Sequence, residues 1–397
     1  VVRVRRDTDN AEQDFTASEV SASALTSFTN ADYAKYTSDF SAGDNSWGSF
    51  DDVTETGNID GIGGLDNNLR LAIGSATSGH RAFRSSILPI GQKFNFSARV
   101  FIPSTNSDVD SFVMRDAVNN SIVGSTTPSQ DEWVTVTAND VTVANAQFRI
   151  NLQDGGADNF AGNGSDVIYL REVVVTQVTS DGFVETWYDQ SGNGNDATQP
   201  TAGSQPKIVD AGSLVSGGIN FDGSNDFLSN STAIMDEAAN AYASVVLSRT
   251  SAATDEIALS LPSGDGGNRG FDLRLTSGTV AQLSIRTNTG GSSNASGSFT
   301  TNGGSNVLIG GTFNAGLSSN EAKFFGNGSL IASASNSGSS LENDGNNGGL
   351  FIGRFGSPTD FGAPLAGKVE EVIIYNTDQT GNRVALEANI ISHYGIS

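Results

Sequence analysis

Short runs in which apolar and polar residues alternate, separated by turn-forming clusters, recur along most of this sequence. In the run Phe94–Ile102 the alternation has a period of two, which sends successive side chains to opposite faces of a β-strand. The intervening clusters, such as Gly290–Gly297 and Asn343–Gly349, are rich in Gly, Asn and Ser and are typical of loops. Many short strands joined by such loops predict an all-β chain built of β-sandwiches.

One helix is predicted, near the end of the sequence, over Arg383–Tyr394. No period of 20–50 residues repeats, which argues against solenoids and propellers, and no heptad run indicates a coiled-coil shaft. The apolar residues of the predicted helix recur at helical spacing and form one stripe: Val384, Leu386, Ile390, Ile391 and Tyr394.

Charge and cysteine content exclude several classes of function. Acidic residues outnumber basic residues by 44 to 21, which gives a net charge of −23. Such a chain repels phosphate backbones and anionic bilayers, so we expect no binding to nucleic acid and no membrane insertion. The absence of cysteine excludes disulfides, thiolate metal sites and cysteine nucleophiles. Because the chain begins Val-Val-Arg with no signal-like segment, we expect a processed chain or part of a longer one.

Two segments near the middle of the chain carry specific motifs. Trp187–Ala197 (WYDQSGNGNDA) and Gly218–Leu228 (GINFDGSNDFL) resemble the opening of a laminin-G-like, concanavalin A-type lectin jelly roll. Gly367–Tyr375, the predicted helix and then His393–Ile396 resemble the last strand and closing helix of that family. The resemblance spans about residues 181–397 and implies a lectin-like sandwich there.

The N-terminal segment has a different likeness. Val1–Phe15 (VVRVRRDTDNAEQDF) is similar to a recurring element of phage and marine bacterial surface proteins, part of which arabinofuranosidase B domains share. In the usual arrangement an Asp-Gly-Phe-Val sequence follows quickly, but here it is Asp181–Val184. We therefore expect Val1–Arg6 to pair as a strand in the same sandwich as residues 181–397.

The intervening residues look like a separate domain. Phe40–Phe50, Leu88–Val100, Glu132–Val136 and Asp166–Val175 resemble strands of carbohydrate-binding modules of families four and nine. The sequence therefore predicts two jelly-roll β-sandwiches, one inserted into the other, since a surface loop tolerates a large insertion. The expected domains are residues 1–30 plus 179–397, and the inserted residues 31–178. The alternative is two tandem sandwiches with a loose N-terminal arm.

Two places are candidate calcium sites. In the loop after Tyr188, Asp189, Asn193 and Asn195 offer side-chain oxygens at close spacing, and calcium takes six to eight such ligands. The alternative is a turn in which Asp and Asn bind their own backbone.

The second calcium site is implied by the resemblance to carbohydrate-binding modules, which often hold a structural ion between their first and last strands. The matching acids are Asp39 or Asp44 near the start and Asp166 near the end. The alternative is that these are solvated surface carboxylates.

Sugar recognition needs flat apolar faces and polar groups. Trp47 lies among Gly, Asn, Ser and Asp and is the best candidate for an exposed ring, with burial in the core as the alternative. Trp133 could equally be a core residue, and Trp187 is more readily explained as one. Arg81 and Arg99 are candidates to bind an acidic glycan, and surface charge is the alternative.

Catalysis is not expected. A serine hydrolase needs a positioned base, and the two histidines lie in different segments. Glu370 and Glu371 are neighbours, which on a strand face opposite ways. The leading prediction is a non-enzymatic virion surface protein, such as a head fibre, capsid decoration or tail fibre. It would bind glycans or a host cell surface and assemble repeatedly with itself and other virion proteins. The alternative is a secreted or cell-surface bacterial adhesin or polysaccharide-binding protein, and a glycosidase is a minor alternative.

Overall fold

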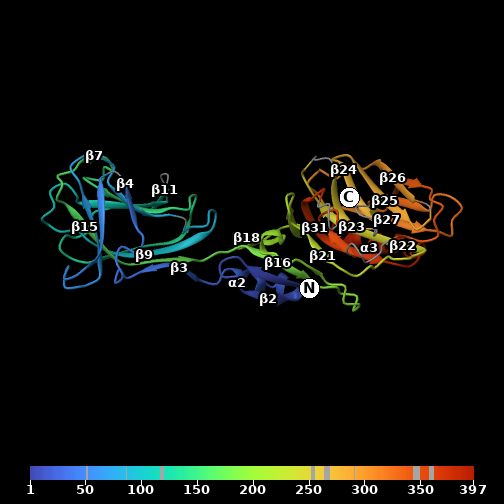
Figure 1. Ribbon diagram of the computed structural model, residues 1–397, viewed down its shortest axis with the longest axis horizontal. Coiled ribbons are helices and arrows are strands. Elements are labelled where there is room, and N and C mark those ends of the chain that lie inside the picture. The colour runs from blue at the N-terminus through green and yellow to red at the C-terminus, as the bar shows by residue number, and fades with distance from the viewer. Residues whose placement is uncertain are drawn as a thin grey trace. The chain divides into compact units, whose positions relative to one another are not determined.

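The computed structural model describes residues 1–50, 52–85, 87–116, 120–251, 255–262, 269–289, 291–342, 349–356 and 362–397. The chain divides into two compact units, and strands make up most of both (Figure 1). Unit 1 comprises Val1–Thr26 and Asp181–Ser397, and unit 2 comprises Ser27–Ser180. The sequence analysis predicted the corresponding domain boundaries between residues 30 and 31 and between residues 178 and 179. The predicted all-β class is confirmed.

The N-terminal strand belongs to unit 1. Strand β1 (Val2–Arg6) pairs antiparallel with β16 (Gly182–Trp187), with Val2 opposite Trp187 and Arg6 opposite Gly182. On its other side β1 pairs with β2 (Glu12–Phe15). Val2 and Val4 are buried, while Arg3 between them forms an ion pair with Asp14. The predicted pairing of the first residues with the chain after residue 180 is therefore confirmed.

Two series of antiparallel strands form the rest of unit 1. The two series pack face to face. The side chain of Leu283 in one series lies so close to Gly311 in the other that a Cβ atom added at Gly311 would be 2.8 Å from it. The first series runs β20 (Ile219–Asp222), β31 (Ala366–Tyr375), β22 (Asn240–Ser248), β27 (Val307–Asn314), β28 (Ala322–Gly326) and β29 (Ser329–Ala334). The second runs β17 (Ala197–Thr198), β21 (Leu228–Asn230), β30 (Leu350–Ile352), β23 (Glu256–Pro262), β24 (Arg269–Ser277), β25 (Val280–Thr287) and β26 (Gly291–Ser298). The short β18 (Lys207–Asp210), β19 (Ser213–Leu214) and the 3-10 turn η1 (Ala202–Ser204) complete the unit.

Helix α3 (Arg383–His393) covers one face of the first series (Figure 1). Ile390 and Ile396 pack there against Val246 and Leu308. The predicted helix is confirmed, but Val384 of the predicted apolar stripe is 66 % exposed. Glu387 is buried instead, because it accepts hydrogen bonds from Tyr242 and from Arg383.

Two short helices near the N-terminus were not predicted from the sequence. They are α1 (Ala17–Ser21) and α2 (Ala24–Thr29). Thr16 and Glu19 form a capping box at the start of α1, which satisfies backbone N–H groups that the helix leaves open. Among the described residues no helix has both the length and the apolar character needed to cross a bilayer.

Unit 2 is a sandwich of a six-stranded and a five-stranded sheet. Their facing side chains, among them Phe96, Val100, Phe112 and Phe148, form one buried core. The six-stranded sheet contains β12 (Val134–Thr142), β9 (Lys93–Phe101), β15 (Val167–Gln177), β6 (Asn68–Ile73) and β5 (Val53–Ile59), with β3 (Tyr33–Ser38) also paired to β15. The five-stranded sheet contains β11 (Asn120–Thr126), β10 (Ser111–Asp116), β13 (Phe148–Gln153), β8 (Arg81–Arg84) and β4 (Gly48–Phe50). Two further short strands, β7 (Thr77–Ser78) and β14 (Phe160–Ala161), pair with each other and form a separate two-stranded sheet.

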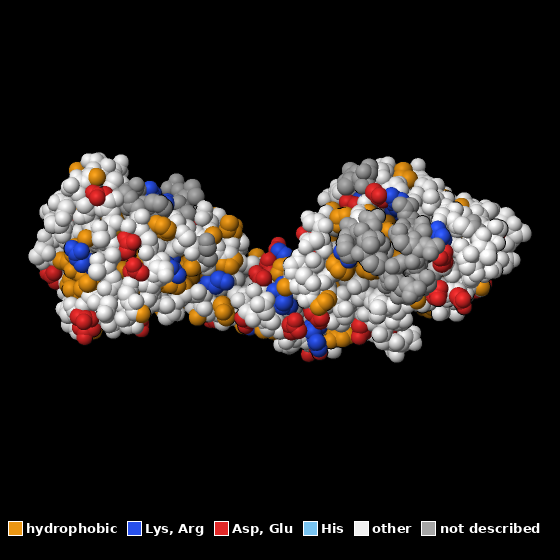
Figure 2. Space-filling model, viewed as in Figure 1, with side chains coloured by type: hydrophobic (Ala, Val, Ile, Leu, Met, Phe, Trp, Pro, Cys, Tyr) orange, Lys and Arg blue, Asp and Glu red, His pale blue; other side chains and the backbone are white. Residues whose placement is uncertain are grey.

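On the face shown in Figure 2, most of the described surface of both units is uncharged. Acidic, basic and hydrophobic side chains are scattered there among uncharged polar groups and backbone (Figure 2). This agrees with a chain in which charged residues are only 16 % of the total.

One buried carboxyl group in unit 1 predicts a pH dependence of stability. Burial, together with the charge of Asp222, raises the pKa of Asp226 to about 7. Between about pH 4 and pH 7 the folded state therefore holds a proton that the unfolded state has lost, so stability falls as the pH rises through this range.

Replacement Asp226→Asn removes this titration and keeps an oxygen that can accept the Asp222 N–H. We expect the variant to be more stable than the native chain at pH 8 by up to about 4 kcal/mol, and similar to it at pH 4. Urea unfolding at the two pH values measures the difference. An equal difference at both would contradict the raised pKa.

Candidate functional site

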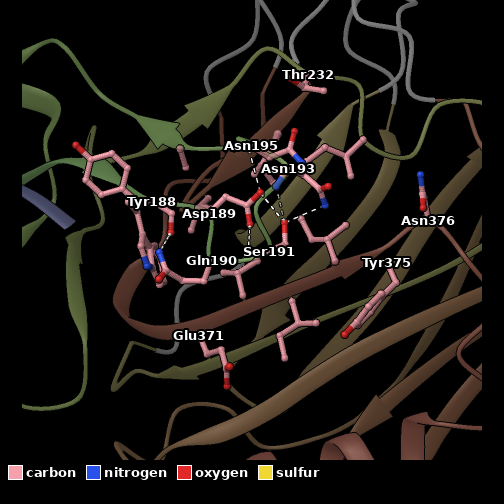
Figure 3. Close-up of a pocket in the computed structure, with 18 of the residues that line it drawn as sticks. Tyr188, Asp189, Gln190, Ser191, Asn193, Asn195, Thr232, Glu371, Tyr375 and Asn376 are labelled. Carbon is pink, nitrogen blue, oxygen red and sulfur yellow. Dashed lines mark hydrogen bonds between the residues drawn. The ribbon is translucent and has the colours of Figure 1, made fainter. Parts of the chain in front are cut away.

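A pocket of about 1000 Å³ opens in unit 1 beside strand β31. β20 pairs only with Ala366–Val369 of this strand. Glu370–Tyr375 therefore have β22 as a neighbour on one side and no described strand on the other. The pocket lies at this open edge. Figure 3 shows the segment Asp189–Asn195 on one side of it, with Glu371, Tyr375 and Asn376 on the other.

The Asp189–Asn195 segment is a turn held by its own hydrogen bonds (Figure 3). Asp189 accepts the N–H and the hydroxyl of Ser191, both at 2.8 Å, and the N–H of Asn195 at 3.1 Å. Ser191 in turn accepts the side-chain amide of Asn193 at 2.9 Å. Partial burial acts to raise the pKa of Asp189, but these hydrogen bonds outweigh it and lower the pKa.

Aromatic and apolar side chains form the walls of the pocket. Tyr375, at the end of β31, is 40 % exposed, and Trp187 and Ile352 also line the cavity. Tyr188 is fixed in position, because its hydroxyl donates to Asp14 at 2.8 Å. Aromatic walls with a few polar groups are typical of a small-molecule pocket.

Several polar groups of the lining remain available. Within the described part of the chain, the side-chain amides of Asn195 and Asn376 and the hydroxyl of Tyr375 make no hydrogen bond to protein. The open edge of β31 adds backbone N–H and C=O groups, which need partners as strongly as side chains do. The pocket can therefore offer both donors and acceptors to a polar ligand.

The acidic residues of the lining are each engaged elsewhere. Glu370 accepts the side-chain amide of Asn306 at 2.6 Å. Burial raises the pKa of Glu371, and His393 and a hydrogen bond with Tyr394 partly oppose the rise. The two neighbouring carboxyl groups thus have different partners, as expected for adjacent residues of a strand.

Trp47, the sequence-based candidate for an exposed sugar platform, was assigned wrongly. It is 4 % exposed and lies in the unit 2 core between Phe40 and Phe148. Its indole N–H donates to the hydroxyl of Tyr36 at 2.8 Å. The small and polar residues around it in sequence do not determine its burial, which depends on strands far away in the chain.

Trp133, for which the sequence left a core and a surface position equally open, is less buried than Trp47. Its ring packs against Phe101, with a centroid distance of 5.5 Å. The guanidinium groups of Arg99 and Arg171 each lie 5.8 Å from the ring centroid. Its indole N–H donates to the carbonyl of Ile62 at 3.0 Å.

The two predicted arginines do not share a site. Arg99 lies on β9 of the six-stranded sheet, where it is 3.7 Å from the carboxylate of Glu172. Arg81 lies on β8 of the five-stranded sheet, opposite Asn151. Their neighbours Ala98 and Ala82 belong to the shared core, so alternation sends the two arginines to opposite outer faces of the sandwich.

The acids of the second predicted metal site belong to separate networks. Asp39 and Asp44 accept hydrogen bonds from Ser41 and Ser46, in their own loop. Asp166 accepts backbone N–H groups from residues 107–109 at 2.6–2.9 Å. Within the described residues, no three His, Cys, Asp or Glu side chains gather closely enough to hold a metal ion.

In both predicted sets each carboxylate already accepts at least one N–H or O–H group, so a calcium ion would have to compete with these donors. We expect the melting temperature to be the same in excess calcium and in chelator, since only binding to the folded state would raise it. Differential scanning calorimetry measures this. A calcium-dependent rise that Asp189→Asn or Asp166→Asn removes would support the sequence-based prediction instead.

Sequence reasoning missed the β31 side of the pocket. The sequence analysis named Tyr375 only as the last residue of a predicted strand. No local feature of the sequence indicates where pairing between β20 and β31 ends. The loop Asp189–Asn195 was found because its residues are close in sequence. Trp187 was identified but assigned to the core.

Comparisons with known proteins yield only distant structural likenesses. No family model and no curated protein matches the chain. Among solved structures it is similar to the CBM22-1 xylan-binding domain of Paenibacillus barcinonensis Xyn10C, with 11 % identity and a TM-score of 0.29 over 38 % of this chain and 97 % of that one. The sialidase CBM40 of Ruminococcus gnavus has 16 % identity and a TM-score of 0.34, over 43 % and 96 %. The tandem CBM22-1–CBM22-2 of Paenibacillus barcinonensis has 11 % identity and a TM-score of 0.33, over 88 % and 99 %.

Proposed function

We propose that this chain is a non-catalytic glycan-binding protein and that the unit 1 pocket beside β31 binds a sugar. The observation that carries the proposal is one cavity of about 1000 Å³ that combines aromatic rings with uncommitted amides. A sugar ring has an apolar face of C–H groups and a rim of hydroxyls, so it suits a site with both kinds of surface.

Each part of the pocket has a separate role in this proposal. The exposed ring of Tyr375 stacks on the face of a sugar. The amide of Asn195, held in place by the turn around Asp189, binds hydroxyl groups on the opposite side (Figure 3). The rigid turn lowers the entropy lost on binding, because its side chains are already ordered.

Binding without catalysis is favoured by the engagement of the three acidic lining residues. Glycoside hydrolysis requires two carboxyl groups that face one bond from opposite sides. Asp189 accepts three hydrogen bonds from its own turn, and Glu370 is bound to Asn306. Glu371 is partly buried beside Tyr394, so each of the three carboxyl groups already has a partner within the protein, which favours binding over hydrolysis.

Replacement Tyr375→Ala tests the sugar-binding pocket. Loss of one stacking ring costs about 0.5–1.5 kcal/mol beyond its buried area, so we expect affinity for a bound neutral oligosaccharide to fall about tenfold. A glycan array identifies the oligosaccharide and isothermal titration calorimetry measures the affinities.

The matched control for Tyr375→Ala is Leu330→Ala. Leu330 is an exposed apolar residue on β29 of the same unit and does not line the pocket. The control should bind as the native chain does. Equal affinities for the native chain and Tyr375→Ala would contradict the assignment of the pocket.

For the biological role, we propose attachment at a surface: a virion surface protein that holds a glycan or host cell and works beside other virion proteins in a repeated assembly. The support is the resemblance of Val1–Phe15 and Trp187–Ala197 to phage and marine bacterial surface proteins. A secreted or cell-surface bacterial adhesin is the alternative that the same resemblance allows.

Immunogold electron microscopy with antibody to this chain distinguishes the two roles. A virion protein should give regular label on phage particles, whereas an adhesin should label bacterial cells or the secreted fraction. Light scattering of the purified chain adds the oligomeric state.

A further inference from the structure

Three arginines gather on the outer face of the five-stranded sheet of unit 2. On neighbouring strands Arg115 lies opposite Arg149, and Arg81 lies opposite Asn151. The residues between them on each strand, such as Ile150, point into the core. Alternation therefore sends all three arginine side chains to the outer face.

This clustering is unusual for such an acidic unit. Residues 27–180 contain nine Lys and Arg against 18 Asp and Glu, yet three of the nine share the outer face of three adjacent strands. Like charges directly opposite each other destabilise a sheet. Opposite charge is also in short supply there. The carboxylates whose charges act on Arg149 are Asp158 and Asp116. Asp158 is bound by Arg115 and by the side-chain amide of Gln153, both at 2.6 Å, and Asp116 accepts the backbone N–H of Ala144 at 2.6 Å.

Arg149 is the residue that this arrangement leaves without a counter-ion. It is 8 % exposed, and its guanidinium makes no hydrogen bond or ion pair with any other described residue. Burial lowers the pKa of Arg149, and the charges of Arg81 and Arg115 lower it further. A buried guanidinium without a partner costs several kcal/mol, a cost that a bound anion would remove.

A second uncommitted group lies beside the arginines. Asn151 is buried, and its amide nitrogen donates to Asp158. The side-chain oxygen of Asn151, Oδ1, accepts no hydrogen bond from any described residue. This acceptor suits a ligand that brings hydroxyl donors as well as negative charge, which a sugar acid does and a bare sulfate ion does not.

We propose that Arg81, Arg115 and Arg149 form a binding site for the carboxylate of an acidic sugar, with Asn151 accepting one of its hydroxyls. The planar guanidinium fork of Arg149 matches a carboxylate in two parallel hydrogen bonds. Recognition is short-range, because the acidic protein as a whole repels polyanions. The site lies in unit 2 and shares only the class of ligand with the pocket of unit 1.

Replacement Arg149→Met tests the site, with galacturonic acid trisaccharide and the neutral galactose trisaccharide as probes for calorimetry on the full chain. We expect the native chain to bind the acidic probe, Arg149→Met to lose at least tenfold in affinity for it, and its melting temperature to stay equal or rise. The rise follows from removing a buried unpaired charge. A purely structural arginine would instead lower the melting temperature without changing affinity, which would overturn the proposal.

Arg171→Met is the matched control, since Arg171 lies on the six-stranded sheet of the same unit and pairs with Glu172 at 2.8 Å. It should bind the acidic probe as the native chain does. A loss of affinity equal to that of Arg149→Met would show a general charge effect and overturn the site.

Arg149→Lys keeps the charge but not the guanidinium fork, so we expect this variant to fold and to bind the acidic probe about tenfold more weakly. Native affinity in this variant would contradict recognition by the fork.

Two further comparisons identify the ligand chemistry. Sulfated galactose binding more tightly than the uronic acid would contradict a carboxylate site, and binding of neither anion by the native chain would overturn the proposal. Tyr375→Ala should leave binding of the acidic probe intact, so a failure of the unit 1 pocket and a failure of this site are distinguishable.

Discussion

Antiparallel pairing at the two ends of unit 2 is the constraint on which the architecture depends. Within unit 2, β3 and β15 pair so that Tyr33 lies opposite Gln177. The two ends of the inserted chain therefore leave the sandwich side by side. Within unit 1, Arg6 lies opposite Gly182, so the first strand pairs with the chain directly after its return from unit 2. Because a folded insertion with adjacent ends acts as a short loop, unit 1 can pair its first strand with β16 at little entropic cost.

Local alternation predicted many of the strands, but not the burial of individual rings. Phe94–Ile102 reads as a strand from its period of two, and β9 ends one residue earlier. Trp47 and Trp133 show where such reasoning fails. Each lies beside polar residues in sequence, and their environments are decided by Phe148 and Phe101, which are brought to them by strand pairing.

The two candidate sites differ in how much of them the sequence could predict. The turn at Asp189 depends on residues within seven positions of one another, so its polar character could be predicted from the sequence. The arginine face depends on the register of β8, β13 and β10, which sets Arg149 opposite Arg115. Arg81 was chosen for its charge alone, and its two partners could not be found without that register.

The half-paired strand β31 has a consequence beyond ligand binding. An open strand edge with apolar residues such as Val372 and Ile374 is a template on which another chain can add a strand. The turn at Asp189 lies at this edge, and the adjacent charges of Glu370 and Glu371 disfavour a second strand there. The same turn that shapes the pocket thus lies where a strand from another copy of the protein would have to pair.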